Sequence, residues 1–93
     1  MSYYAQTADV SSPGGRAKLT GSVSGSVPVE FYLFGRTGLI QSVQIQKWTR
    51  TSSDQSLNTG YIYSGRYVHY GYIQPYNPPS GQGGIATVTC YGQ

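Results

Sequence analysis

The most regular feature of the chain is an alternation of apolar and polar residues between Leu19 and Leu33. The odd positions are Leu, Gly, Val or Phe throughout, whereas the even positions are Thr, Ser, Pro, Glu or Tyr. Successive side chains of a β-strand point to opposite faces of the sheet, so this pattern predicts strands that bury one face. The run is longer than a typical strand. We therefore expect a bend or break at Gly25 or at Pro28, because proline cannot donate to the ladder.

Turn chemistry divides the rest of the chain into further strands. GRTG at residues 35–38 is a turn by composition, and 39–48 is a strand with Val43 and Ile45 on one face. Residues 49–60 form a polar loop, and a loop of proline and glycine precedes a final strand, GIATVTCYG. No segment has the apolar spacing of a helix. The sequence predicts an all-β fold, a small antiparallel sandwich or barrel of about five to seven strands.

The first residues do not share this pattern. Residues 1–15 lack a periodic apolar run and end in SSPGG, a segment of turn chemistry. We expect them to form an N-terminal arm, either flexible or docked on a neighbouring surface. Residues 16–93 then form a single β domain.

Composition indicates a folded domain with an uncharged polar surface. Charged residues make up only 10% of the chain, against about 25% in an average domain. Aromatic residues reach 14%, and ten of them are tyrosines. A chain of 93 residues has a thin core. Small domains often gain stability by pairing with copies of themselves, so we expect a homo-oligomer.

Groups for catalysis are scarce. The chain has three acids, one histidine and one cysteine, too few for a paired-carboxylate mechanism or a short-spaced metal site. We therefore predict no enzyme, no catalytic residue, no metal and no cofactor. Cys90 stands in a plain strand sequence, TVTCY, and is expected to be a small buried side chain. His69 is either a hydrogen-bonded histidine on a sheet face or a polar contact in a binding site.

The N-terminal sequence has neither the basic nor the apolar region of a secretory signal. No run approaches the roughly 20 apolar residues that span a membrane, so we expect a soluble protein with no membrane span. The sequence does not give the location. An extracellular or particle-associated protein, delivered by a non-classical route, is compatible with it.

Six tyrosines occupy the sixteen residues from Tyr61 to Tyr76. A two-residue turn at Ser64–Gly65 would make a hairpin, and a bulge at Gly65 would instead continue one strand. In both cases alternation sends rings to both faces of one sheet. We expect Tyr67 to be interior, and Tyr70 and Tyr72 to lie on a face that another molecule covers.

Three kinds of molecule would suit a tyrosine-rich face. A second copy is one, because subunit interfaces are rich in tyrosine and poor in charge. A glycan is another, since rings stack on sugars while polar groups bond the hydroxyls. Single-stranded nucleic acid also stacks on aromatic side chains, but the six cations are spread along the chain, which argues against a nucleic-acid ligand.

The sequence thus favours a non-enzymatic, oligomeric, lectin-like adhesion domain that recognises carbohydrate. The alternatives are a structural subunit of a particle, fibre or surface layer, and a small toxin or inhibitor that docks on a protein. Trp48 is either a core residue or a rim anchor for a ligand. The candidate ligand-binding residues are Trp48, Tyr61, Tyr63, Arg66, Tyr70, Tyr72, Tyr76 and Asn77.

Overall fold

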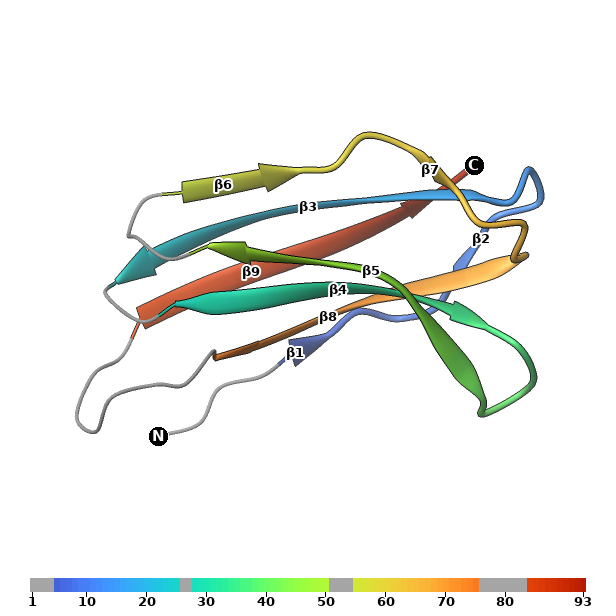
Figure 1. Ribbon diagram of the computed structural model, residues 1–93, viewed down its shortest axis with the longest axis horizontal. Helices are drawn as coiled ribbons and strands as arrows, with labels where there is room; N and C mark the ends of the chain where they lie inside the picture. Colours follow the sequence, from blue (N-terminus) through green and yellow to red (C-terminus); the bar gives the residue numbers. More distant parts are fainter. Residues whose placement is uncertain (1–4, 26–27, 51–54, 76–83) are drawn as a thin grey trace.

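The computed structural model describes residues 5–25, 28–50, 55–75 and 84–93, and their strands form two antiparallel sheets packed as a sandwich (Figure 1). No helix occurs within these ranges. This confirms the predicted all-β fold, and of the two predicted architectures the chain adopts the sandwich.

The first sheet has the order β1-β8-β4-β5, and β2 also pairs with β8. Its strands are β1 (Ala5–Gln6), β2 (Val10–Ser11), β4 (Val29–Arg36), β5 (Ser42–Arg50) and β8 (Val68–Pro75). In the second sheet β3 is central, with β9 along one edge and both β6 and β7 along the other. These strands are β3 (Arg16–Gly25), β6 (Gln55–Asn58), β7 (Ile62–Tyr63) and β9 (Gly84–Gly92).

The predicted alternation is what fills the space between the sheets. On β4 the odd residues Val29, Phe31 and Leu33 are buried, and on β3 Leu19 and Val23 are buried. The break is also where it was expected, because β3 ends at Gly25 and β4 begins at Val29. The core is completed by Ala17, Leu57, Ile73 and Cys90. Burial raises the pKa of the Cys90 thiol to about 11, so this thiol stays protonated near neutral pH.

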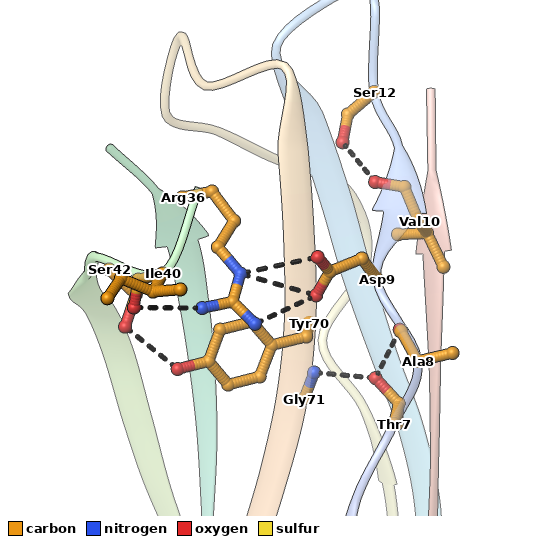
Figure 2. Close-up of polar contacts among 10 residues, drawn as sticks. All are labelled: Thr7, Ala8, Asp9, Val10, Ser12, Arg36, Ile40, Ser42, Tyr70 and Gly71. Carbon is orange, nitrogen blue, oxygen red and sulfur yellow. Dashed lines mark hydrogen bonds and ion pairs between the residues drawn. The ribbon is translucent and has the colours of Figure 1, made fainter. Parts of the chain in front are cut away.

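The described part of the N-terminal arm, residues 5–15, is docked along β8. Strand β1 places Ala5 opposite Ile73, and β2 places Val10 opposite His69. Between the two short strands, the Thr7 amide donates to the Gly71 carbonyl, and the Gly71 amide donates back to Thr7 Oγ1, both at 2.9 Å (the latter bond is drawn in Figure 2). The arm therefore forms an edge of the first sheet.

The β4–β5 hairpin differs from the prediction. Leu39 and Ile40 were expected to begin a strand, but they are almost fully exposed at the tip of this hairpin. The Thr37 amide donates to the Gln41 carbonyl at 3.0 Å, which closes a turn, and β5 begins only at Ser42. Ile45 packs against the core, whereas Val43 is exposed.

The predicted polar loop over residues 49–60 is also largely wrong. Strand β5 continues to Arg50, and β6 pairs with β3 over residues 55–58. Leu57, opposite Gly21, is buried against the core and fixes this strand on the sandwich. A single apolar residue in a polar segment gives no periodic signal, which is why the sequence pattern missed β6.

Candidate functional site

The chain changes sheets at Ser64–Gly65, in the middle of the tyrosine segment. Strand β7 pairs with β3 in the second sheet, whereas β8 belongs to the first sheet. The Gly15 carbonyl accepts from the amides of Ser64 (2.8 Å) and Gly65 (3.1 Å), and Gly65 has a φ of +79°. Both the predicted hairpin and the predicted bulge are therefore wrong. Tyrosines before and after this connection lie on opposite outer faces of the sandwich.

The first of these surfaces, the tyrosine–cation face, lies on the outside of the second sheet. It consists of Arg16, Lys18, Tyr61, Tyr63 and Tyr91. Because Ala17 and Leu19 point into the core, Arg16 and Lys18 point outward. Register places Tyr63 opposite Arg16, and Tyr91 opposite Lys18.

Each cation of this face lies over an aromatic ring. The Lys18 ammonium is 4.9 Å from the ring centroid of Tyr61 and 5.1 Å from that of Tyr91, so it lies between two rings. The Arg16 guanidinium carbon is 5.4 Å from the Tyr63 centroid. Exposed contacts of this kind contribute about 0.5–1 kcal/mol each. They hold three rings in place that remain 42%, 68% and 43% exposed for Tyr61, Tyr63 and Tyr91.

The tyrosine–cation face carries positive charge without a neighbouring Asp or Glu side chain in the described part of the chain. Asp9 and Glu30 pair with Arg36 and Lys47, all on the first sheet and its edge. Neither Arg16 nor Lys18 has an acid or a hydrogen-bond acceptor as a partner within the described ranges.

Hydroxyl groups continue this face along the sheet. Thr20 lies opposite Thr89, and Ser22 lies opposite Thr87, with 2.9 Å between the hydroxyl oxygens of the second pair. All four side chains alternate with buried or half-buried residues and so point outward. The outer face of the second sheet thus offers rings and cations at one end and a double row of hydroxyls beyond them.

The second surface, the aromatic strip, lies on the outside of the first sheet. It is formed by Tyr32 and Phe34 of β4 and by Tyr70 and Tyr72 of β8. Phe34 stacks on Tyr70 with a centroid separation of 5.1 Å and an interplanar angle of 8°. Phe34 meets Tyr72 edge to face at 6.4 Å. These rings bury one another on an outer face, which is why Tyr32, Phe34 and Tyr72 are only half-exposed.

Tyr70 is covered by the chain itself. Its ring is 8% exposed, and the Arg36 guanidinium carbon lies 4.4 Å above its centroid (Figure 2). Its hydroxyl is 2.8 Å from Ser42 Oγ on β5. Arg36 in turn holds the docked arm, because it pairs with Asp9 at 3.2 Å. The group that covers Tyr70 is thus a side chain of the same protein, Arg36.

The Glu30 carboxylate lies at the other end of the strip, and both of its oxygens have partners. Gln74 Nε2 donates to Glu30 Oε1 at 3.2 Å and to the Tyr32 hydroxyl at 3.1 Å, and Lys47 Nζ is 3.6 Å from Glu30 Oε2. Burial would raise the pKa of Glu30. The hydrogen bonds from Tyr32 and Gln74, with the Lys47 charge, outweigh burial and hold this pKa below its usual value. Burial and the adjacent carboxylate raise the pKa of Tyr32.

A buried polar cluster lies under the Ser64–Gly65 connection. His69 is fully buried, with Nδ1 2.6 Å from Ser12 Oγ and Nε2 2.6 Å from Ser64 Oγ. The Arg66 amide donates to Ser64 Oγ at 3.1 Å, and Ser12 Oγ is 3.4 Å from the Val10 carbonyl. In the neutral imidazole one ring nitrogen donates to its serine and the other accepts from its serine, so both nitrogens have a hydrogen-bond partner. Burial lowers the pKa of His69.

The structure divides the predicted ligand-binding residues. Tyr61 and Tyr63 lie on the tyrosine–cation face, Tyr70 and Tyr72 belong to the aromatic strip, and Arg66 is exposed on the connection between β7 and β8. Trp48 pairs with Phe31 and packs against the core. Tyr76 and Asn77 lie outside the described residues.

The expectation that Tyr67 is interior is wrong, since this residue is 72% exposed. It lies on the connection between the sheets, and β8 begins only at Val68.

Sequence reasoning missed Arg16, Lys18 and Tyr91. A signal for the two cations was present, because they flank Ala17 and extend the alternation that begins at Leu19. They share one face with three tyrosines.

The described residues contain no cluster of three or more His, Cys, Asp or Glu side chains that would hold a metal ion. The same ranges contain no helix of the length and apolarity needed to cross a bilayer. Comparison of the chain with protein-family models, with curated proteins and with solved structures finds no match in any of the three.

Proposed function

We propose that the protein is a non-enzymatic recognition domain that binds carbohydrate through the tyrosine–cation face. One observation carries this proposal: three exposed rings lie on a sheet surface beside two cations whose N–H groups have no acceptor within the described residues. Protein–protein and protein–ligand sites both use tyrosine because it offers a large rigid surface with a polar tip.

The chemistry of the face suits a sugar. Tyrosine rings stack on the apolar faces of pyranose rings, and the ammonium of Lys18 between Tyr61 and Tyr91 supplies donors for the ring hydroxyls. The rows of Ser and Thr hydroxyls beyond the rings both donate and accept. With two cations and no Asp or Glu side chain paired with them in the described ranges, the face favours neutral or anionic saccharides over cationic ligands.

Replacing Tyr91 or Tyr61 with serine is expected to weaken binding of a saccharide about fivefold or more, because a stacking ring contributes about 1–3 kcal/mol. A glycan array screened with the purified chain identifies the saccharide, and calorimetric titration of that saccharide measures the loss. Leu39→Ser is the matched control, since it removes an almost fully exposed apolar side chain from the β4–β5 turn, which belongs to the other sheet.

Two results would contradict the carbohydrate proposal. One is an array on which nothing binds at high protein concentration, and the other is unchanged affinity in both tyrosine variants. Binding of single-stranded oligonucleotides with a steep salt dependence would assign the same face to nucleic acid instead.

A second candidate function, self-association through the aromatic strip, is favoured by one observation on the opposite face. The charges that flank the strip are already paired within the chain, Glu30 with Lys47 and Arg36 with Asp9. Half-exposed rings surrounded by neutralised charge resemble a subunit interface, which is rich in tyrosine and poor in free charge. The occupant that we propose for this face is a second copy of the chain.

Light scattering coupled to size exclusion is expected to give the mass of a closed oligomer for the wild-type chain. Phe34→Ser should shift that mass to the monomer, because Phe34 contacts Tyr32, Tyr70 and Tyr72 at the centre of the strip. Tyr63→Ser, on the opposite face, should leave the mass unchanged. A monomer at every concentration would exclude self-association, and an open polymer would favour a structural subunit.

A further inference from the structure

A pocket of about 340 Å³ lies at one end of the sandwich. It is lined by residues 36–38, at the start of the β4–β5 turn, and by residues 65–68, in the connection between β7 and β8. Figure 1 shows both segments at the same end of the two sheets. Two arginines, Arg36 and Arg66, contribute to its lining.

The stem of Arg66 occupies a defined place. A Cβ atom built on Gly35 would lie 2.7 Å from Arg66 Cγ and 3.1 Å from Arg66 Cβ. The missing side chain at Gly35 thus leaves the space in which the Arg66 stem packs against β4. Its guanidinium has no hydrogen-bond or ion-pair partner within the described residues.

The wall of the pocket that carries Arg66 is fixed in the absence of any ligand. The Gly15 carbonyl accepts two amides of the connection, and the Arg66 amide donates to Ser64 Oγ, which is bonded to buried His69. On the opposite wall, the Thr37 amide is bonded to the Gln41 carbonyl. A site that is ordered before binding loses less conformational entropy when the ligand arrives.

The charge of the pocket is positive. Asp9 neutralises Arg36, with Oδ1 and Oδ2 both 3.3 Å from Arg36 Nε (Figure 2). The Arg36 Nη1 donor also reaches the Ile40 carbonyl at 3.4 Å. No carboxylate is among the residues that line the pocket. Arg66 therefore supplies a full positive charge that the described chain does not compensate.

We propose that this pocket binds a tetrahedral oxyanion, a sulfate or phosphate group, with Arg66 as its principal contact. The planar guanidinium presents paired N–H donors whose spacing matches two oxygens of such a group. The Thr37 hydroxyl on the facing wall is a further donor. This site is separate from the tyrosine–cation face and does not depend on the proposed carbohydrate function.

The two sites are nevertheless neighbours. Tyr63 of the tyrosine–cation face has its hydroxyl 3.6 Å from the position of a Cβ on Gly65, which lines the pocket. The oxyanion has two chemical sources, a sulfated saccharide or a phosphorylated molecule. The first would allow one ligand to contact both the ring of Tyr63 and the guanidinium of Arg66.

The test is a titration of the isotopically labelled chain with sodium sulfate and sodium phosphate, followed by amide chemical shifts at constant ionic strength. We expect saturable shifts of the Gly38, Gly65 and Arg66 amides, and Arg66→Gln should weaken both anions at least tenfold. Arg66→Lys, which keeps the charge but not the planar fork, should give an intermediate affinity. Arg50→Gln is the matched control, because Arg50 bonds the Ser56 and Thr49 carbonyls and does not line the pocket.

Shifts that rise linearly with salt, that sodium chloride reproduces, or that persist in Arg66→Gln would overturn the proposal. All of these variants change exposed or half-exposed side chains, and dispersed spectra verify that each one is folded. O-sulfated N-acetylglucosamine and O-phosphoserine then distinguish the two sources. Saturable, Arg66-dependent binding of either compound supports the site, and failure of both compounds together with both inorganic anions refutes it.

Discussion

Replacing Gly21 with alanine is expected to lower the free energy of unfolding by about 3 kcal/mol, a large part of the roughly 5–14 kcal/mol available to a domain of this size. Gly21 lies at the centre of β3, between Leu57 of β6 and Val88 of β9. A Cβ atom there would overlap the Thr87 carbonyl oxygen and lie 2.8 Å from Phe31 Cε1. The edge of the Phe31 ring fills the space that a side chain at Gly21 would need.

The design of this experiment separates the two clashes. Phe31→Leu in the Gly21→Ala background shortens the side chain that meets the new methyl group, but it leaves the overlap with the backbone of β9. We therefore expect that Phe31→Leu does not restore the stability lost in Gly21→Ala. The double variant should also carry the cost of the smaller core residue. Chemical denaturation followed by circular dichroism and by Trp48 fluorescence measures each free energy.

Ser22→Ala is the control for the Gly21 variant. Ser22 is the next residue on β3, it points outward, and it should cost no more than about 0.5 kcal/mol when replaced. A loss below about 1 kcal/mol for Gly21→Ala would contradict the close approach of the two sheets at this position.

The core was predictable because its signal is local. The alternation from Leu19 to Leu33 depends only on the direction of successive side chains along a strand, and both Phe31 and Leu33 are buried as that rule requires. The break between β3 and β4 is equally local, since it follows from a glycine and a proline.

The path of the tyrosine segment was not predictable, because it depends on a residue far away in the chain. Ser64 and Gly65 resemble a hairpin turn until the Gly15 carbonyl accepts both of their amides and draws them toward β3. Gly15 and Gly65 approach so closely that a Cβ on Gly15 would lie 2.9 Å from Gly65 Cα. Composition gives the turn residues, but not the sheet to which the next strand belongs.

The same limit applies to the candidate site. Tyr61 and Tyr63 were among the predicted ligand-binding residues, with their facing left open. The ring that completes their cluster, Tyr91, comes from the last strand and joins them only through its register with Lys18. The sequence predicted a single tyrosine-rich face, whereas the structure has two. One is exposed and cationic, and the other is half-buried with its charges paired.

The second large effect that we expect is at His69. His69→Ala should lower the free energy of unfolding at neutral pH by about 3 kcal/mol, because it leaves a cavity and deprives Ser12 and Ser64 of their buried partner. His69→Gln, which retains hydrogen-bonding capacity but does not titrate, should cost less. Thermal and chemical unfolding of the two variants give this difference.

The same histidine sets the pH dependence of stability. Burial lowers the pKa of His69 in the folded chain below the 6.5 of an unperturbed histidine, so the unfolded state binds more protons in this range. The free energy of unfolding should therefore fall as pH falls from about 6.5 toward the lowered pKa, and this slope should be absent from His69→Gln.

Glu30 acts in a different pH range, which makes the two contributions separable. The pKa of Glu30 in the folded chain lies below its usual 4.5, so its stabilisation is complete above that pH and is lost as pH falls further. Glu30→Gln should remove this lower slope and leave the upper one. If His69→Gln instead retained the slope that begins near pH 6.5, a group other than His69 would cause this pH dependence, and the lowered pKa of the buried imidazole would be contradicted.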